Sequence, residues 1–131
     1  MKSVTPYLTF QGNAKEAMAF YTRVFDDAEL RFLQEYDESV PEMAGKVMQG
    51  VIRIHDLLLM VTDSKVPAEF AFSPSMSFLI ECQSLQEIEK YYLKLKKKGA
   101  IHVPLDEYGA ADRFAWVQDK FGVTWQLNFM K

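Results

Sequence analysis

The residues best suited to acid–base chemistry in this chain are two carboxylic acids, Glu81 and Asp112. If both face one cavity, they can divide the work of general acid and general base between them. The competing interpretation is structural, with Arg53 or Arg113 neutralising one of the two in an ion pair. The sequence leaves both interpretations open.

Motifs for other kinds of catalysis are absent. The chain has no G-x-S-x-G, P-loop or H-E-x-x-H sequence. Its six glycines never form a G-x-G, so the glycine-rich turn of a doubly wound methyltransferase is missing. The single cysteine, Cys82, lies in the apolar segment FLIEC and is expected to be a small buried hydrophobic residue. We therefore expect no cofactor.

Two amphipathic helices are expected to position these residues. Apolar side chains recur at helical spacing over residues 14–25 and again over residues 85–95. Asn13 is the predicted N-cap of the first helix, and a capping box begins at Ser84 before the second. Gly99 is predicted to end the second helix in the left-handed conformation.

The chain repeats itself. A shift of 71 positions brings Phe20-Tyr21 onto Tyr91-Tyr92, and each helix follows one strand-like segment and precedes three. A repeat of this size indicates a duplicated unit. We predict an α+β fold with two βαβββ modules, about 1–63 and about 74–131, in a single domain over 1–131. The modules should form a curved mixed sheet cup with the helices on its outer face.

The alternation of side chains predicts which face of the sheet is concave. Residues 124–129 alternate polar and apolar side chains, and helices should cover the fully apolar face. We assign residues to the concave face by following the alternation of side chains from one strand to the next through the hairpins. For the two opening strands we use the 71-residue offset. A one-residue slip would invert the assignment. The side chains expected to bind a ligand there are Phe10, Gln49, Arg53, Met60, Trp116 and Gln126.

Composition narrows the possible partners. A net charge of −3 favours neither nucleic acid nor an anionic membrane. The opening MKSVTPYLTF lacks the apolar stretch of a signal peptide, so we expect a cytoplasmic protein. Exposed sheet edges need covering, which favours a homodimer. The expected partner is a small molecule, although a solvated sheet face, or one covered by a second subunit, also explains the pattern.

Three stretches resemble a known family. PYLTFQGNAKEAMAFYTRVF, VIRIHDLLLMVTD and DKFGVTWQLNF are similar to the vicinal oxygen chelate superfamily, which includes glyoxalase I, bleomycin-resistance proteins and extradiol dioxygenases. Within it they resemble the PhnB-like branch, often labelled 3-demethylubiquinone-9 3-methyltransferase-like. The resemblance extends over essentially the whole chain and implies the duplicated fold.

The resemblance also implies where a metal would bind. In metal-using members the first and last strands of each half supply the ligands, and these positions correspond to Pro6, Met60, Ser77 and Gln126. None offers the imidazole or carboxylate that a catalytic divalent ion prefers, so we expect no metal. At Gln49 the branch often has a histidine. Glutamine cannot shuttle a proton near pH 7, so Gln49 is expected to orient a ligand.

Two functional hypotheses follow. The first is a metal-free protein that binds a small, partly apolar molecule in the concave cavity. The second is an enzyme of the same superfamily, a lyase, a dioxygenase or another small-molecule enzyme. It would use Glu81 and Asp112, or a metal site that the sequence does not reveal.

Overall fold

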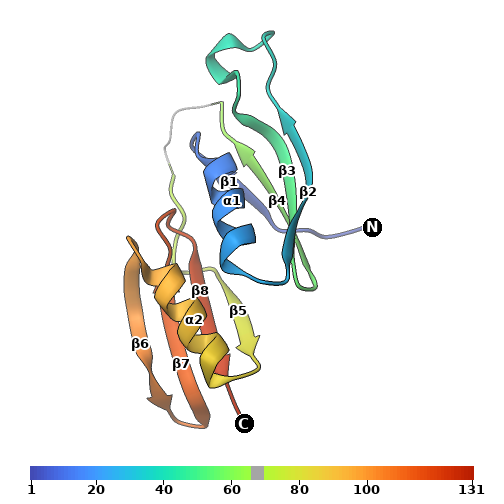
Figure 1. Ribbon diagram of the computed structural model, residues 1–131. Helices are drawn as coiled ribbons and strands as arrows, with labels where there is room; N and C mark the ends of the chain where they lie inside the picture. The colour runs from blue at the N-terminus through green and yellow to red at the C-terminus, as the bar shows by residue number, and fades with distance from the viewer. Residues whose placement is uncertain (66–69) are drawn as a thin grey trace. The chain divides into compact units, whose positions relative to one another are not determined.

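The chain forms two compact units that divide between residues 69 and 70. The computed structural model describes residues 1–65 and 70–131. Each unit has one helix and one four-stranded mixed sheet in the order β-α-β-β-β (Figure 1). This confirms the predicted α+β fold with two βαβββ modules.

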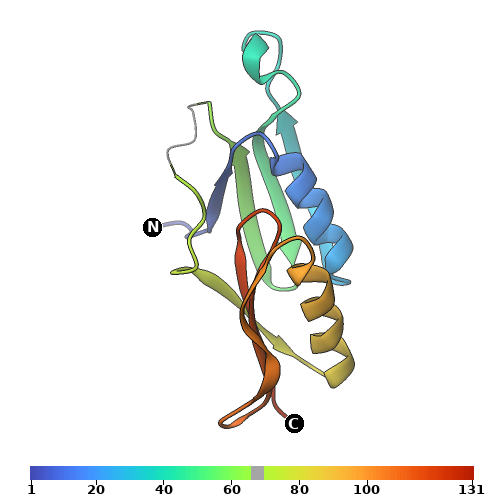
Figure 2. The ribbon, with the colours of Figure 1, turned by 90° about the vertical axis from the view of Figure 1, so that its left-hand side faces the viewer.

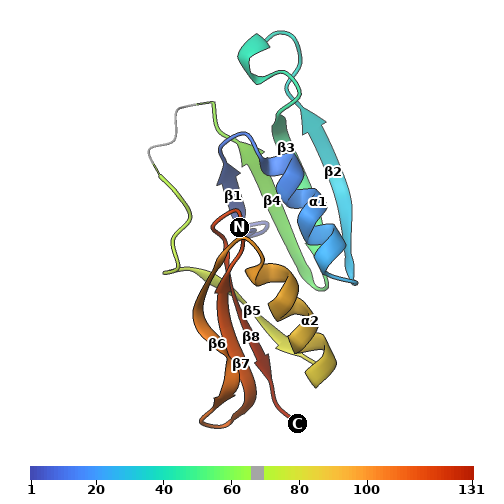
Figure 3. The same ribbon diagram turned by 60° about the vertical axis from the view of Figure 1, so that its left-hand side comes forward.

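In the first unit, the sheet has the strand order β1-β4-β3-β2. β1 runs parallel to β4, and the other neighbours are antiparallel (Figure 3). A short 3-10 turn, η1, lies between β2 and β3. The elements are β1 (Tyr7–Phe10), α1 (Ala14–Val24), β2 (Ala28–Glu35), η1 (Pro41–Met43), β3 (Val47–Ile54) and β4 (Leu57–Asp63).

The second unit repeats this topology with the order β5-β8-β7-β6. β5 is parallel to β8, and the remaining pairs are antiparallel. Its elements are β5 (Ser77–Cys82), α2 (Leu85–Lys96), β6 (Ala100–Tyr108), β7 (Ala111–Gln118) and β8 (Thr124–Phe129). Among the described residues, no helix combines the length and the apolar character needed to cross a membrane.

Each helix covers one face of its own sheet (Figure 2). In the first unit Tyr21 of α1 is fully buried, as are Ile52 and Leu59 of the sheet. In the second unit Ile88 of α2 and Leu127 of β8 are buried in the same way. Each such side chain contributes about 1.5–3 kcal/mol by leaving water. Helix packing therefore determines which sheet face remains free.

Two glycines allow close backbone packing. A Cβ on Gly50 would lie 2.6 Å from Met18 Sδ and 2.9 Å from Val61 Cγ2, so a larger residue on β3 would crowd Met18 of α1. A Cβ on Gly99 would lie 1.9 Å from the backbone oxygen of Gln118. The left-handed residue after α2 is Lys98, with φ of 61°. The predicted role of Gly99 as the left-handed stop is therefore wrong, because steric space is what requires glycine there.

A buried carboxylate, Asp63 at the end of β4, caps α1. Its Oδ1 accepts hydrogen bonds from the backbone N–H groups of Gly12 at 2.9 Å and Ala14 at 3.0 Å. Its Oδ2 accepts from Val47 N at 2.9 Å. Asn13, the predicted N-cap, makes no side-chain cap bond. Asn13 is therefore the N-cap residue, as predicted, but the side chain that caps the helix is that of Asp63.

The second unit caps its helix locally. Ser84 Oγ accepts from Glu87 N at 3.1 Å, and Glu87 Oε1 accepts from Gln83 N at 2.9 Å, which agrees with the predicted capping box. Its buried carboxylate, Asp119, lies in the β7–β8 connection. Asp119 Oδ2 accepts from Trp125 Nε1 at 2.9 Å, and Oδ1 accepts from two backbone N–H groups of the turn.

The predicted orientation of Phe10 is wrong. Phe10 is 1% exposed and pairs with Asp63, so it lies on the face that α1 covers. The reason is loop length, because three residues separate β1 from α1 and only two separate β5 from α2. The 71-residue offset that superimposes the helices therefore shifts the opening strands by one residue. This shift exchanges their faces.

We predict that Asp63→Ala destabilises the protein by about 3–5 kcal/mol, because three backbone N–H groups lose their acceptor. The control is Asp56→Ala, which removes an exposed carboxylate from the β3–β4 turn and should cost less than about 0.5 kcal/mol. Urea unfolding followed by circular dichroism measures both. Equal losses in the two variants would contradict the structural role of Asp63.

Candidate functional site

The helix-free face of the second sheet gathers polar and aromatic side chains. Parallel pairing sets Ser77 opposite Thr124, Leu79 opposite Gln126 and Glu81 opposite Asn128. Antiparallel pairing places Trp116 opposite Gln126 and Phe114 opposite Asn128. We call this surface the second open face; its residues are Ser77, Leu79, Glu81, Phe114, Trp116, Thr124, Gln126 and Asn128.

Two amides on this face are held in place by neighbouring side chains. Gln126 Nε2 donates to Ser77 Oγ at 2.9 Å, and Asn128 Nδ2 donates to Glu81 Oε2 at 2.9 Å. Both bonds join β8 to β5. Between them Leu79 is 58% exposed. The face therefore combines oriented hydrogen-bonding groups with accessible apolar surface, as ligand sites commonly do.

Trp116 lies beside this polar pair, on β7. Its Nε1 is buried, and among residues 1–65 and 70–131 it has no hydrogen-bond partner. Its ring centroid lies 5.3 Å from that of His102, with the rings tilted by 43°. His102 Nε2 is 3.1 Å from Gln118 Oε1.

His102 was missed by sequence reasoning. The β6–β7 register shifts between Ile101 and Val103, so His102 is the unpaired residue of a bulge. The alternation of β6 is broken at this point, and no periodic pattern predicts the side to which its imidazole turns. The available signal of irregularity was Pro104, because proline cannot donate a hydrogen bond to a neighbouring strand.

The structure does not bring Glu81 and Asp112 together as a coupled pair. They lie on β5 and β7 with β8 between them, so their backbones are about 10 Å apart. Asp112 Oδ2 accepts from the backbone N–H of Lys131. Arg113 pairs with Glu107 at 2.9 Å. Each group thus has its own partner.

The helix-free face of the first sheet carries the other predicted residues. Val51 lies opposite Met60, and Met60 lies opposite Tyr7, so these side chains share one face with Gln49 and Arg53. Tyr7 is 50% exposed and stands where Phe10 was expected. The same one-residue difference in loop length that buries Phe10 turns Tyr7 outward.

Arg53 is held in a charged network. Its Nη1 lies 2.9 Å from Asp27 Oδ1, and its Nε lies 3.3 Å from Glu29 Oε1. Asp27 Oδ2 is 2.7 Å from His55 Nδ1. Hydrogen bonds from His55 and Arg53 lower the pKa of Asp27, and the bond with Asp27, with the charge of Asp56, raises the pKa of His55. Arg53 therefore ties the β3–β4 turn to β2.

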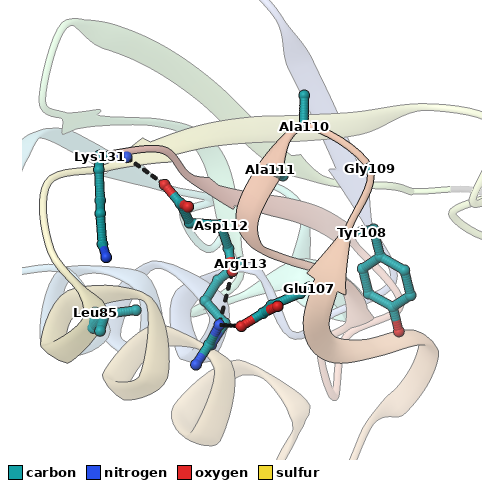
Figure 4. Close-up of a pocket in the computed structure, with 9 residues that line it drawn as sticks. All are labelled: Leu85, Glu107, Tyr108, Gly109, Ala110, Ala111, Asp112, Arg113 and Lys131. Carbon is teal, nitrogen blue, oxygen red and sulfur yellow. Dashed lines mark hydrogen bonds and ion pairs between the residues drawn. The ribbon is translucent and has the colours of Figure 1, made fainter.

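A separate pocket of about 480 Å³ lies at the end of the second sheet (Figure 4). The β6–β7 turn, Leu85 at the start of α2 and Lys131 line it. Its polar groups bond to one another, since Arg113 pairs with Glu107 and Asp112 accepts from the Lys131 N–H. A ligand there would have to displace existing bonds, which makes the second open face the better candidate.

The donor set does not fit the divalent ion of the superfamily. Met60 offers a thioether, while Ser77 and Gln126 are bonded to each other. The predicted position Pro6 is wrong by one residue, because the longer β1–α1 connection makes Thr5 the counterpart of Ser77. Proline has no side-chain ligand, and threonine offers only a neutral hydroxyl. Within the described part of the chain, no three His, Cys, Asp or Glu side chains lie close enough to hold a metal. Carboxylates suit hard divalent ions and imidazole suits ions such as zinc, iron and nickel, and these positions offer neither ligand.

Cys82 is a buried side chain on the helix-covered face of β5. Burial, reinforced by the charges of Glu87 and Glu81, raises its pKa to about 12. The thiolate is the nucleophile, so this thiol is inert near neutral pH. The structure confirms Cys82 as a small buried residue.

We predict that iodoacetamide modifies Cys82 in the native protein at pH 8 about two to three orders of magnitude more slowly than in urea, because the raised pKa and burial both suppress attack. Mass spectrometry over time measures the rate. Similar rates in the folded and unfolded protein would contradict this prediction.

The His55–Asp27 pair predicts a pH dependence. Because Asp27 raises the pKa of His55 above its ordinary value of 6.5, the contribution of the pair is fully present below that value. It is lost as the pH rises through the raised pKa. Both side chains are exposed, so the contribution is weak. An NMR titration should give a raised pKa for His55 that Asp27→Asn lowers; an unchanged midpoint in that variant would rule out the pairing.

Comparisons with known proteins agree with this architecture. A model of the 3-demethylubiquinone-9 3-methyltransferase family matches residues 2–128. The solved structure of the PhnB protein from Bacillus cereus, a putative 3-demethylubiquinone-9 3-methyltransferase, is 38% identical. It has a TM-score of 0.92 and covers 98% of this chain and 99% of its own.

Two further relatives extend the comparison. Protein YjdN of Escherichia coli K12 is 28% identical over 142 residues, which cover 98% of this chain and 95% of that protein. The fosfomycin resistance protein FosX of Listeria monocytogenes is 13% identical with a TM-score of 0.67, covering 100% of this chain and 94% of its own, and it shows the fold alone. The chain belongs to the 3-demethylubiquinone-9 3-methyltransferase family, in its PhnB-like form, and has the glyoxalase-like fold of the vicinal oxygen chelate superfamily.

Proposed function

We propose that this chain binds a small, partly apolar molecule on the second open face, without the divalent metal of its superfamily. One observation carries the proposal: each strand of the second sheet contributes one side chain to a continuous row. Ser77 of β5 bonds to Gln126 of β8, Gln126 pairs with Trp116 of β7, and Trp116 contacts the ring of His102 of β6.

The row is suited to binding because its polar members are already oriented. The bond from Gln126 to Ser77 holds the amide before a ligand arrives, which reduces the entropy lost on binding. Leu79 exposes 58% of its surface beside the row. Covering it with a ligand would contribute about 1 kcal/mol.

The methyltransferase in the family description is not supported by the residues present. A nucleotide-like methyl donor is usually held by free backbone N–H groups in a glycine-rich turn after the first strand. Here the turn after β1 is Gln11–Gly12–Asn13, and the N–H groups of Gly12 and Ala14 already bond to Asp63. The turn therefore has a structural role.

The second candidate is an enzyme that uses Glu81 as a general base. The observation in its favour is that Asn128 orients the exposed Glu81 carboxylate on the same face as Leu79. Glu81→Gln separates the two functions, because an enzyme would lose turnover by about 10²–10⁴-fold. A binding protein would retain affinity within about threefold, since an amide keeps the hydrogen-bonding shape.

The binding proposal is tested with the neutral fluorescent probe N-phenyl-1-naphthylamine. Leu79→Ser should weaken probe binding about five- to tenfold, because it removes apolar surface from the second open face. Leu93→Ser is the matched control, since Leu93 is 59% exposed but lies on α2. Fluorescence titration gives both affinities. No binding by the wild type, or equal loss in the two variants, would overturn the proposal.

A further inference from the structure

The two tryptophans of the second sheet differ in hydrogen bonding. Trp125 is buried under α2 and its Nε1 donates to Asp119 Oδ2 at 2.9 Å. Trp116 faces the opposite side, and its Nε1 is buried without a partner in the part of the chain that the structure describes. Proteins rarely leave a buried N–H unpaired, and such a group in a native structure calls for an explanation.

The surroundings of Trp116 are those of a ligand site. Gln126 lies opposite it across the strand pair and His102 lies against its ring. The Trp116 residue is partly exposed even though Nε1 is covered. His102 is exposed, and its Nε2 forms a hydrogen bond with the side chain of Gln118.

The charges near this row disfavour an anionic ligand. Glu81 and Asp112 are carboxylates on strands β5 and β7 of the same sheet. Arg113, the adjacent cation of β7, is paired with Glu107. An anion over this face would meet the like charges of Glu81 and Asp112. The row itself offers an amide, a hydroxyl, an indole and an imidazole, which suit neutral polar groups.

We infer that the Trp116 Nε1–H is the hydrogen-bond donor of the site and that the ligand is an uncharged planar molecule with an acceptor at its edge. The acceptor is a carbonyl oxygen or an aromatic ring nitrogen. This inference rests on the proposed binding function. The ligand's ring covers Leu79 and the exposed part of Trp116, while its acceptor satisfies the buried N–H.

Quinoline and naphthalene form a matched pair of probes, because they have the same shape and only quinoline has an acceptor nitrogen. In ¹H–¹⁵N NMR of the full chain, quinoline should move the Trp116 indole resonance downfield and leave that of Trp125 in place. Naphthalene should bind without this downfield shift. Trp116→Phe, which keeps a ring and removes the N–H, assigns the resonance.

The affinities of the Trp116→Phe variant for the two probes provide a second measurement. Trp116→Phe should weaken quinoline about five- to tenfold and change naphthalene less than about twofold. If both probes bind and neither distinguishes the wild type from this variant, the donor role is wrong while the proposed function stands. If neither probe binds, both are overturned. Should the variant fail to fold, triple-resonance NMR of the wild type assigns the two indole resonances, and the titration still decides by which of them moves.

A second control tests the alternative that Gln126 satisfies the indole in solution. In that case Gln126→Leu would shift the Trp116 indole resonance upfield in the free protein, and the inference would be overturned. We expect this resonance to keep the position of an unpaired indole in the variant without a probe. The quinoline-induced downfield shift should also persist, because Nε1 remains available.

Discussion

The buried carboxylate of Asp63 is the constraint on which the first unit depends. It joins the β1–α1 turn, the first residue of α1 and the start of β3 through three backbone N–H groups. The β1–α1 turn that Asp63 holds is one residue longer than the β5–α2 connection. Gly12 lies in this turn at φ of 100°, a conformation that glycine adopts without strain. The extra residue determines that Phe10 is buried and Tyr7 is exposed. A single buried acceptor thus sets both the helix start and the faces of β1.

The two units share a topology but not their buried polar chemistry. The acceptor of the second unit, Asp119, lies in the β7–β8 connection and holds Trp125 in the core. Its helix is capped by the nearby Ser84 instead. On the helix-free faces, the first unit has the Arg53 network with Asp27 and the second has the row from Ser77 to His102. The two units thus have the same strand order and different polar side chains.

The fold of the vicinal oxygen chelate superfamily does not by itself specify which side chains stand at its metal-ligand positions. With the one-residue shift of β1 included, the positions that supply ligands in metal-using members here contain two hydroxyls, Thr5 and Ser77, the thioether of Met60 and the amide of Gln126. The hydroxyl of Ser77 and the amide of Gln126 bond to each other and orient a polar pair. These side chains are hydrogen-bond donors and acceptors rather than the carboxylate and imidazole ligands of a divalent ion.

The sequence by itself determined the two modules, both helices and the faces of the second sheet, because periodicities of 3.6 and 2 are local properties of the chain. It also identified Cys82 as buried. Only the tertiary structure decided the face of Phe10, the capping of α1 and the contact of His102 with Trp116. Each of these depends on groups brought together from distant positions, as with Asp63 and Ala14, 49 residues apart. A repeat offset cannot reveal a one-residue difference in loop length, and a strand bulge breaks the alternation from which a face is predicted.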